Sequence, residues 1–507
     1  MKRAALLIVV CLCGGLWSRV TDAATVGFDA AAAGAVWSAA LTYIAPRSLQ
    51  PLTVPQMTIW GLNGLAALDP DLNTTLQAGQ VRLYGPNALL LAIPAPADND
   101  AAGWGKAAAQ IAAAAYAASP ALQQAGTQVI VSSFFDELFN HFDPYSRYET
   151  PQVSAQNQLV IMGLAGTGLT FEKKSGHVVI SAVAADSPAE NAGLTPGMVV
   201  LSVDGRTAYP SAVNTLNAAM SGIAGSTTTI SLQDISDAPP VTQQVTLTRG
   251  FIPPQTVFPE PSPGPGLVAL KISAFNKGTA TQFSAALATL MAQSPAPTGL
   301  VLDLRGNRGG VLRQAVLVAD SLLPTGVIVQ TMGRDPDADQ SFSAEGSDLT
   351  NGAKLAVLVD GQTASAAEIL AAALADNSRA VVIGSETLGK GLVQTLTSLP
   401  DGGELYVTWS RVLAPRGWPL QSLGVMPQVC TSLGPQRLEA EMASLDKGQN
   451  LQAQAVASAR AMRAPVDMDN VLRIRNQCPA DIGADMDFNA AGHILASQTA
   501  YQAALLP

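Results

Sequence analysis

The stretch from residue 355 to residue 395 constrains the fold most, because it holds two short apolar runs separated by an alanine-rich segment. Residues 355–359 and 380–383 consist only of Leu, Ala, Val and Ile, which is typical of buried strands. Between them a turn at Asp360-Gly361 precedes apolar positions that recur at helical spacing. The pattern predicts a strand, a helix and a second strand.

Ser365 stands where this helix is expected to begin. Backbone N–H groups in the first turn of a helix have no intrahelical partner, so they can stabilise a negatively charged oxygen. A structural interpretation competes with this one. Ser365 and Glu368, three residues later, also form an ordinary capping box.

Lys390 follows the second strand in a glycine-flanked turn, residues 384–391, and has Leu388 and Leu392 as neighbours. A lysine in apolar surroundings loses solvation, so its pKa falls and it can act as a base. Lowering that pKa from about 10.4 to about 7 requires roughly 4–5 kcal/mol of discrimination against the charge, which burial can supply. The pair Ser365 and Lys390 therefore predicts a serine nucleophile activated by lysine.

A phosphate-binding loop is the main alternative for the turn. Gly384, Gly389 and Lys390 fit G-x-x-x-x-G-K, but the next residue is glycine where the motif needs Ser or Thr to hold Mg²⁺. No histidine lies near Ser365 in a recognisable triad motif. The chain's histidines are His141, His177 and His493. Gln394 has the same parity as Lys390, so in a strand its amide would lie on the same face and could orient the amine.

The residues around this pair resemble the C-terminal processing (tail-specific) serine peptidases. The resemblance rests on T-A-S-A-A-E around Ser365, on G-K-G around Lys390 and on Gln394. It implies catalysis by a Ser-Lys pair, with Gln394 orienting the lysine. The segment L-D-L-R-G-N-R-G-G resembles a second family motif, whose final glycine, here Gly310, contributes to the oxyanion hole. The backbone N–H of Ala366 is then the expected second donor.

Residues 158–250 have the composition of a small β-rich domain. The segment G-L-A-G-T-G-L-T-F and the later D-S-P-A-E-N-A-G-L resemble a PDZ domain. Such domains bind an extended peptide tail as an added strand and hold its carboxylate with loop N–H groups. A scaffold that binds no peptide is the alternative. The peptide-binding residues expected from the resemblance are Gly163, Leu164, Gly166, Gly168 and Leu169.

The predicted architecture is a multidomain α/β protein that begins with an export signal. Residues 1–23 show a basic start, an apolar run and a small-x-Ala end. An uncleaved anchor, or a lipoprotein modified at Cys11 or Cys13, is the alternative for this segment. The expected domains are a helical N-terminal region at 24–157, a PDZ-like domain at 158–250, a Ser-Lys peptidase core at 251–429 and a helical C-terminal extension at 430–507. The segment D-P-Y-S-R-Y, which ends at Tyr148, resembles the family's segment before its binding module.

Composition and cysteine usage limit the partners and the compartment. Charged residues are only 13% of the chain and the net charge is −10, which indicates no nucleic-acid partner. Cys430 and Cys478 remain after signal removal, and in an oxidising compartment they can form a disulfide if geometry allows. We expect no cofactor, no metal and no integral membrane span after signal removal. Homo-oligomerisation is left open.

The sequence therefore predicts an exported serine endopeptidase, periplasmic or secreted, that acts on proteins or peptides with apolar C-termini. A non-catalytic PDZ adaptor with a degenerate peptidase core is the alternative from another functional class. The chain departs from the family's pattern at Ala367 and Gln428. Neither residue touches the proposed catalytic atoms, so these departures concern fine specificity.

Overall fold

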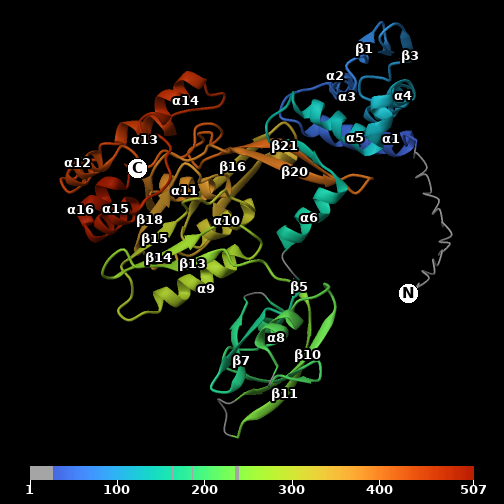
Figure 1. The fold of residues 1–507 in the computed structure, drawn as a ribbon. Coiled ribbons are helices and arrows are strands. Elements are labelled where there is room, and N and C mark those ends of the chain that lie inside the picture. Colours follow the sequence, from blue (N-terminus) through green and yellow to red (C-terminus); the bar gives the residue numbers. More distant parts are fainter. Residues whose placement is uncertain (1–26, 163–164, 185–186, 210, 235–238, 507) are drawn as a thin grey trace, which may run out of the picture. The chain divides into compact units, whose positions relative to one another are not determined.

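The computed structural model describes residues 27–162, 165–184, 187–209, 211–234 and 239–506. The chain divides into two compact units, residues 1–42 with 53–142, and residues 43–52 with 143–507. The fold mixes helices and sheets, as predicted (Figure 1). The predicted export signal lies outside the described residues and stays a prediction.

The first unit is built of helices and one small sheet. Its helices are α1 (Ala30–Arg47), whose last residues belong to the second unit, α2 (Val54–Leu62), α3 (Gly64–Leu68), α4 (Ala101–Ala118) and α5 (Pro120–Phe139). Its strands, β1 (Asn73–Gln77), β2 (Gln80–Tyr84) and β3 (Leu89–Pro94), form an antiparallel sheet. The sequence predicted a helical region here, and these three strands were missed.

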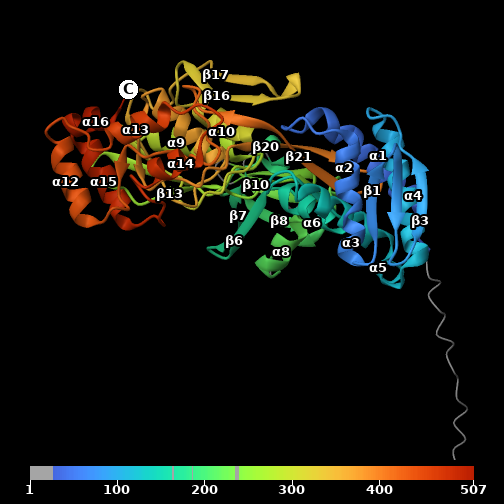
Figure 2. The ribbon, with the colours of Figure 1, turned by 90° about the horizontal axis from the view of Figure 1, so that it is seen from above.

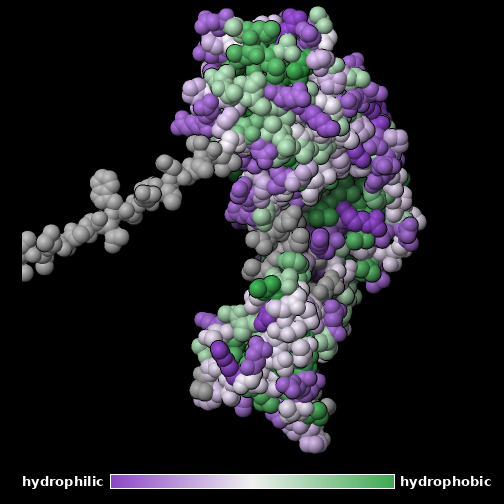
Figure 3. Space-filling model, turned by 90° about the vertical axis from the view of Figure 1, so that its right-hand side faces the viewer, coloured by the Kyte–Doolittle hydropathy of each residue, from purple (hydrophilic) through white to green (hydrophobic). Residues whose placement is uncertain are grey.

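The physical reason lies in the turn between β1 and β2. Ala78 and Gly79 have φ of 51° and 69°, the left-handed pair that two-residue hairpins need, and alanine is not a residue that announces such a turn. Val81 and Leu83 alternate toward the interior and are fully buried. Leu76 and Leu89, near the ends of their strands, are exposed. Figure 3 shows hydrophobic side chains near the top of the view, and this sheet also lies near the top of Figure 1.

The β-rich segment of the second unit is a sheet in the order β11-β10-β8-β7-β6, in which β6 is an edge strand. Its elements are β5 (Ala165–Gly166), β6 (Leu169–Lys174), β7 (His177–Val183), α7 (Pro188–Asn191), β8 (Val199–Val203), β9 (Arg206–Thr207), α8 (Val213–Met220), β10 (Thr227–Asp234), β11 (Val241–Thr248) and β12 (Gly250–Phe251). Phe171, Ile180 and Leu232 are among the side chains of its separate core. The β-rich prediction for this region is confirmed.

A six-stranded sheet forms the centre of the second unit (Figures 1 and 2). Its strands, in spatial order, are β13 (Val257–Glu260), β14 (Leu267–Ile272), β15 (Gly299–Asp303), β18 (Lys354–Val359), β19 (Ala380–Gly384) and β22 (Val429–Cys430). All neighbours pair in parallel except β13 with β14. The loops after β15, β18 and β19 therefore meet at one edge of the sheet.

The two faces of this sheet are covered by different helices, because alternate residues of each strand point to opposite sides. On one face Leu355 and Val357 pack with α9 (Thr279–Met291), α10 (Leu312–Asp320) and α11 (Ala366–Asp376). On the other, Ala356 and Leu358 pack with α12 (Pro435–Leu445), α15 (Asp485–Ala496) and α16 (Gln498–Ala504). The C-terminal extension is helical, as expected, and supplies a whole face of the core.

A second, antiparallel sheet has the order β17-β16-β21-β20. Its strands are β16 (Gly326–Gly333), β17 (Gln340–Ala344), β20 (Leu392–Ser398) and β21 (Glu404–Leu413), and β4 (Arg147–Glu149) pairs with β21. The remaining helices of this unit include α6 (Pro151–Met162), α13 (Ala453–Arg460) and α14 (Met468–Arg475). Within the described ranges, no helix has both the length and the hydropathy needed to cross a bilayer.

A disulfide joins Cys430, the last residue of β22, to Cys478, just after α14, with an S–S distance of 2.07 Å. The pairing left open by the sequence is therefore formed. It ties the C-terminal helices to the central sheet.

This bond predicts that a denatured, unreduced chain lacking residues 1–23 shows no free thiol. After reduction, two thiols per chain should react with a thiol reagent. The bond spans a sequence separation of 48 residues, and closing such a loop stabilises the fold by about 2–4 kcal/mol. Replacing both cysteines by serine should therefore lower the Tm. Two reactive thiols without reduction would contradict the bridge.

Candidate active site

Ser365 is the N-cap residue of α11, at the sheet edge where the loop after β18 ends. Its φ of 57° and ψ of −118° are rarely adopted by residues with a side chain, and such strain costs about 1–3 kcal/mol. Its N–H donates to Glu368 Oε2 at 2.7 Å, but its hydroxyl makes no helix-cap hydrogen bond. Only half of the predicted capping box forms, so the hydroxyl is free for chemistry.

The glycine-rich loop after β15 lies directly against Ser365. A Cβ built on Gly309, whose φ is 92°, would lie 2.8 Å from Ser365 Cβ and 2.9 Å from Ala366 N. At Gly310, whose φ is 140°, it would lie 2.1 Å from the Phe275 carbonyl oxygen. Only glycine fits either position. Across the part of the chain that the structure describes, no hydrogen bond uses the N–H of Gly310 or Ala366, so both can bind an oxyanion.

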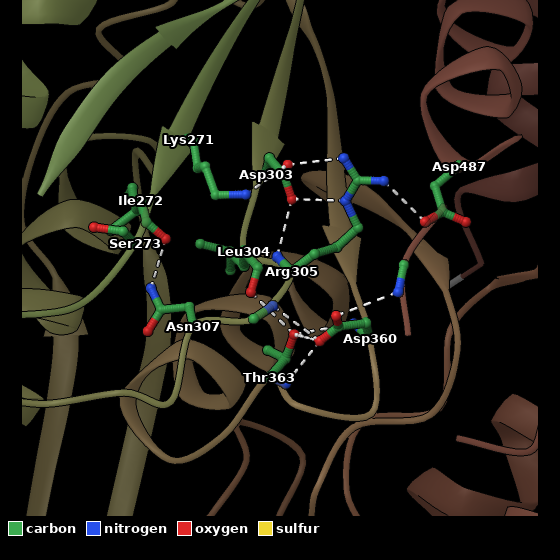
Figure 4. Close-up of polar contacts among 12 residues, drawn as sticks. Lys271, Ile272, Ser273, Asp303, Leu304, Arg305, Asn307, Asp360, Thr363 and Asp487 are labelled. Atoms are coloured by element: carbon green, nitrogen blue, oxygen red, sulfur yellow. Dashed lines mark hydrogen bonds and ion pairs between the residues drawn. The ribbon is translucent and has the colours of Figure 1, made fainter. Parts of the chain in front are cut away.

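Two buried polar side chains hold these loops together (Figure 4). Asp360 Oδ1 accepts from the N–H of Gly306 at 3.0 Å and from the N–H of Thr363 at 2.9 Å. The Asn307 side chain holds the glycine-rich loop, because its Nδ2 donates to the Ile272 carbonyl at 2.7 Å and its Oδ1 accepts from the N–H of Gly309 at 2.8 Å. The backbone carbonyl of Asn307 accepts from the N–H of Ala364 at 2.9 Å. The loop of the oxyanion donors and the loop of the serine are therefore fixed to each other. The sequence analysis did not single out either side chain.

An ion-pair cluster fixes the strand end that precedes the glycine-rich loop (Figure 4). Asp303 Oδ2 lies 2.8 Å from Arg305 Nη2 and 3.4 Å from Lys271 Nζ. Arg305 also pairs with Asp487 of α15 at 3.0 Å. Burial acts to raise the pKa of Asp303, but the hydrogen bonds and charge of Arg305, with the charge of Lys271, hold that pKa below its usual value.

Lys390 lies in the turn between β19 and β20, with Nζ 4.8 Å from the centre of the Tyr145 ring. The turn is tight, because a Cβ on Gly391 would lie 2.1 Å from a backbone nitrogen of the facing loop. Burial lowers the pKa of Lys390 and the charge of Arg147 lowers it further, while Glu368 opposes the shift. A lowered pKa is what Lys390 needs in order to act as a base.

The carboxylate of Glu368 joins this turn to the serine. It is fully buried, and Oε2 accepts from the N–H of Ser365 at 2.7 Å and of Lys390 at 2.9 Å. Oε1 accepts from the N–H of Gly389 at 2.7 Å and from the Thr387 hydroxyl. Burial raises the pKa of Glu368, and these hydrogen bonds oppose the rise. The sequence analysis treated this residue only as part of a helix cap.

Gln394 lines the same cavity as Lys390, but its amide is engaged elsewhere. Its Nε2 donates to Thr408 Oγ1 at 3.1 Å and to the Leu392 carbonyl at 3.3 Å. The orienting role of Gln394 therefore stays a prediction.

Residues 143–146 form a part of the site that the sequence analysis did not identify. Asp143 Oδ1 accepts from the N–H groups of Tyr145 and Ser146 and from the Thr408 hydroxyl, at 2.9, 3.0 and 2.7 Å. The Tyr145 ring is thereby held beside Lys390, and burial raises the pKa of its hydroxyl, so the ring stays neutral. The D-P-Y-S motif could be seen in the sequence, but its contact with Lys390 could not be predicted.

Ser365 and Lys390 open into one cavity of about 680 Å³. The structure brings four predicted residues together in its lining: Ser365, Lys390, Gly310 and Gln394. Apolar side chains complete one part of the wall, including Leu312, Ile369, Leu392, Val393 and Val412. The cavity can accommodate an extended chain with an apolar side chain beside the serine.

The predicted peptide-binding residues are placed only in part. Gly163 and Leu164 lie outside the described residues. Gly166 belongs to β5, Gly168 has a φ of 86°, and Leu169 begins the edge strand β6. Their role stays a prediction.

The family model described as "Peptidase family S41" matches residues 266–431 of this chain. The chain is 35% identical to a carboxyl-terminal-processing protease of Synechocystis sp., over 56% of this chain and 67% of that protein. It is 30% identical to a carboxy-terminal-processing protease of Bartonella bacilliformis, over 60% of this chain and 69% of that protein. Among solved structures, the photosystem II D1 C-terminal processing protease shares 30% identity, covers 58% of this chain and 81% of its own, and has a TM-score of 0.36.

The turn that carries Lys390 also contains a second buried carboxyl group, Glu386. Its side chain is fully buried, and neither oxygen has a hydrogen-bond partner among the described residues. The guanidinium group of Arg475 lies nearby, with Nε 3.9 Å from Oε2. Burial raises the pKa of Glu386 to about 8, Arg475 opposes the rise and Glu368 adds to it.

This pKa predicts a pH-dependent stability. A carboxyl group with a raised pKa binds its proton more tightly in the folded state, so stability is lost as the pH rises between about 4.5 and 8. The Tm gain of Glu386→Gln over the wild type should therefore grow from pH 5 to pH 8 and then level off. Glu439→Gln, at an exposed position, is the control. A Tm difference that is constant across this range would contradict the prediction.

Proposed function

Because this chain belongs to the carboxyl-terminal processing proteases of peptidase family S41, we propose that it is an endopeptidase in which Lys390 activates Ser365. Membership of the family makes the chain a hydrolase and a serine protease. The catalytic pair, the recognition of tails and the export of the enzyme are the finer parts of the proposal.

The observation that carries the proposal is the shared environment of the two residues. Both line one cavity of about 680 Å³, and one buried carboxylate, Glu368, binds both of their backbone N–H groups. The serine hydroxyl is not used as a helix cap, and burial lowers the pKa of the lysine. A serine–lysine pair needs an unused hydroxyl and an amine with a lowered pKa in the same cavity.

In the first half of the reaction Lys390 Nζ takes the proton of the Ser365 hydroxyl, and the oxygen attacks the scissile carbonyl. The N–H groups of Gly310 and Ala366 stabilise the oxyanion of the tetrahedral intermediate. When the intermediate collapses, the Lys390 ammonium gives its proton to the leaving amine. The N-terminal part of the substrate is then an ester of Ser365.

In the second half Lys390 takes a proton from a water molecule that attacks the ester, and the same two N–H groups bind the new oxyanion. The proton returns to the serine oxygen as the acid is released. Gln394 is the proposed positioning residue for the amine. All proton transfers use Lys390, so the proposal names no cofactor. The adaptor alternative is not favoured, because the full set of proposed catalytic residues is present.

Tail recognition is proposed for the β-rich segment, from its resemblance to PDZ domains. The edge strand β6 supports the proposal, because an added strand needs an open edge beside a helix. Here the side chain of Asn217, on α8, already binds that edge. Its Oδ1 accepts from the Phe171 N–H at 2.7 Å and its Nδ2 donates to the Phe171 carbonyl at 3.2 Å. An incoming tail would replace these two contacts.

The proposed substrates are exported proteins with apolar C-termini, and the proposed location is the periplasm or the exterior of the cell. The disulfide between Cys430 and Cys478 supports an oxidising compartment. Self-association stays a prediction.

The mechanism predicts that Ser365→Ala and Lys390→Ala each abolish cleavage of casein or of a fluorogenic peptide, with the circular dichroism spectrum unchanged. Lys390→Arg should also fail, because a guanidinium group does not lose its proton near neutral pH. Rates at least about 10³-fold below the wild type are expected, since nucleophile and base act as a unit. Turnover similar to the wild type in any of the three variants would rule out the pair.

Tail recognition predicts that a peptide with an amidated C-terminus is cleaved less efficiently than the same peptide with a free carboxylate. Loss of a charge-assisted contact worth about 1.5–3 kcal/mol weakens binding about ten- to a hundredfold, so the effect should appear in KM. Asn217→Ala should lower the KM for the free tail, and Asn214→Ala, at an exposed position on α8, is the control. Equal KM values for both peptides would refute tail recognition while leaving the catalytic pair intact.

A further inference from the structure

The side chain of Arg475, at the end of α14, fills the space between two loops next to the proposed base. Its Nη1 donates to the carbonyls of Ser422 and Leu423 at 3.2 and 3.1 Å, and its Nη2 donates to the carbonyl of Thr387 at 2.9 Å. Thr387 belongs to the turn that carries Lys390. One guanidinium group thus bonds to three backbone carbonyls from the two loops that meet at this turn.

Cys478, three residues after the end of α14, contacts the same turn independently of Arg475. The carbonyl of Cys478 accepts from the N–H of Glu386 at 3.3 Å. Cys478 is itself fixed by its disulfide to Cys430, and Cys430 pairs with Gly384, the residue at which the turn begins. The disulfide and these two contacts therefore fix the start of the turn.

The two loops that Arg475 bonds to are packed closely against each other. A Cβ on Gly424 would lie 2.8 Å from the Thr387 carbonyl and 3.0 Å from Arg475 Nη1. The N–H of Ser422 donates to the Gly389 carbonyl at 2.9 Å, one residue before Lys390. A displacement of Arg475 is therefore transmitted to the backbone beside the lysine.

The contacts continue from the turn to the serine. The Thr387 hydroxyl accepts from the N–H of Val425 at 2.8 Å and donates to Glu368 Oε1. Glu368 binds the N–H groups of Lys390 and Ser365. The path from Arg475 to the two proposed catalytic residues thus consists of hydrogen bonds through buried or half-buried groups.

We propose that the C-terminal segment, through Arg475 and the Cys430–Cys478 disulfide, is a positioning element that sets the orientation and desolvation of Lys390. The inference rests on the proposed serine–lysine mechanism. Arg475 and Cys478 lie beyond residues 266–431, which the family model matches. Arg475 touches no substrate, so its effect acts through the turn.

The test compares Arg475→Ala and Arg475→Lys with Arg473→Ala in the full chain. Arg473 lies on the same helix, is exposed, and hydrogen-bonds to Asn470 of its own helix at 2.6 Å. With casein and a fluorogenic peptide as substrates, Arg475→Ala should lower kcat at least about tenfold with little change in KM, because a misplacement of about 1 Å costs up to a hundredfold. Arg475→Lys should recover part of the loss, since an ammonium group still donates to one or two carbonyls. Arg473→Ala should behave as the wild type.

The pH profile separates positioning from general support of the fold. Lys390 faces Glu368 of α11, Tyr145 just before β4 and Arg147 of β4. Glu386, in the same turn as Lys390, lies 3.9 Å from Arg475 Nε. These four residues are unchanged in every variant. If Arg475 maintains the desolvation of the lysine, the rising limb of kcat should move to higher pH in Arg475→Ala. If the substitution only lowered the Tm, the pH midpoint of the kcat profile would not change.

Reduction of the disulfide is an independent test of the proposal. Dithiothreitol converts the bond to two thiols and is itself oxidised to a cyclic disulfide. Because Cys430 and Cys478 are fully buried, thiol titration has to confirm the reduction before kcat is measured. We expect kcat to fall and the midpoint to move as in Arg475→Ala. The double variant Cys430→Ser, Cys478→Ser should show the same change without a response to the reagent. If Arg475→Ala does not fold, Arg475→Lys and the reduced wild type decide in its place.

The inference is overturned if Arg475→Ala, or the reduced protein, keeps the kcat and pH midpoint of Arg473→Ala. Failure of the mechanism itself gives a different result. In that case Ser365→Ala would cleave as well as the wild type, whatever Arg475 does.

Discussion

The geometry of the proposed active site depends on one buried carboxylate. Glu368 accepts four hydrogen bonds, from the N–H groups of Ser365, Gly389 and Lys390 and from the hydroxyl of Thr387. A fully buried carboxyl group is costly unless its oxygens are paired, so the four donors have to stay in place around it. The serine and the lysine turn are thereby fixed to one side chain on the first turn of α11. The strained backbone of Ser365 persists because this pairing holds it.

The same group also shows how much of the site the sequence could reveal. The two strands, the helix and the glycine turn of residues 355–395 follow from local periodicity and turn residues, and they confirm the predictions for β18, α11 and β19. Ser365 and Lys390 could be singled out because each occupies an unusual local position. The other contacts of Glu368 come from beyond the next strand, so its short-range role as a cap was the only one visible.

Contacts between distant segments account for what was missed. Tyr145 reaches Lys390 because Asp143 binds Thr408, which is on β21. No periodicity links these positions. The small sheet of β1, β2 and β3 was missed because its first turn uses Ala78 at positive φ. The C-terminal helices were predicted as helices, but their alternate packing against β18 requires knowing the order of the strands.

The central claim is that a lysine with a lowered pKa removes the proton of Ser365. The most direct measurement is the rate at which a fluorophosphonate modifies Ser365, followed by mass spectrometry as a function of pH. The account predicts a rate that rises with a midpoint clearly below the 10.5 of an ordinary lysine, and the loss of this rise in Lys390→Ala. A midpoint at the ordinary lysine value, or the same profile in Lys390→Ala, would contradict it.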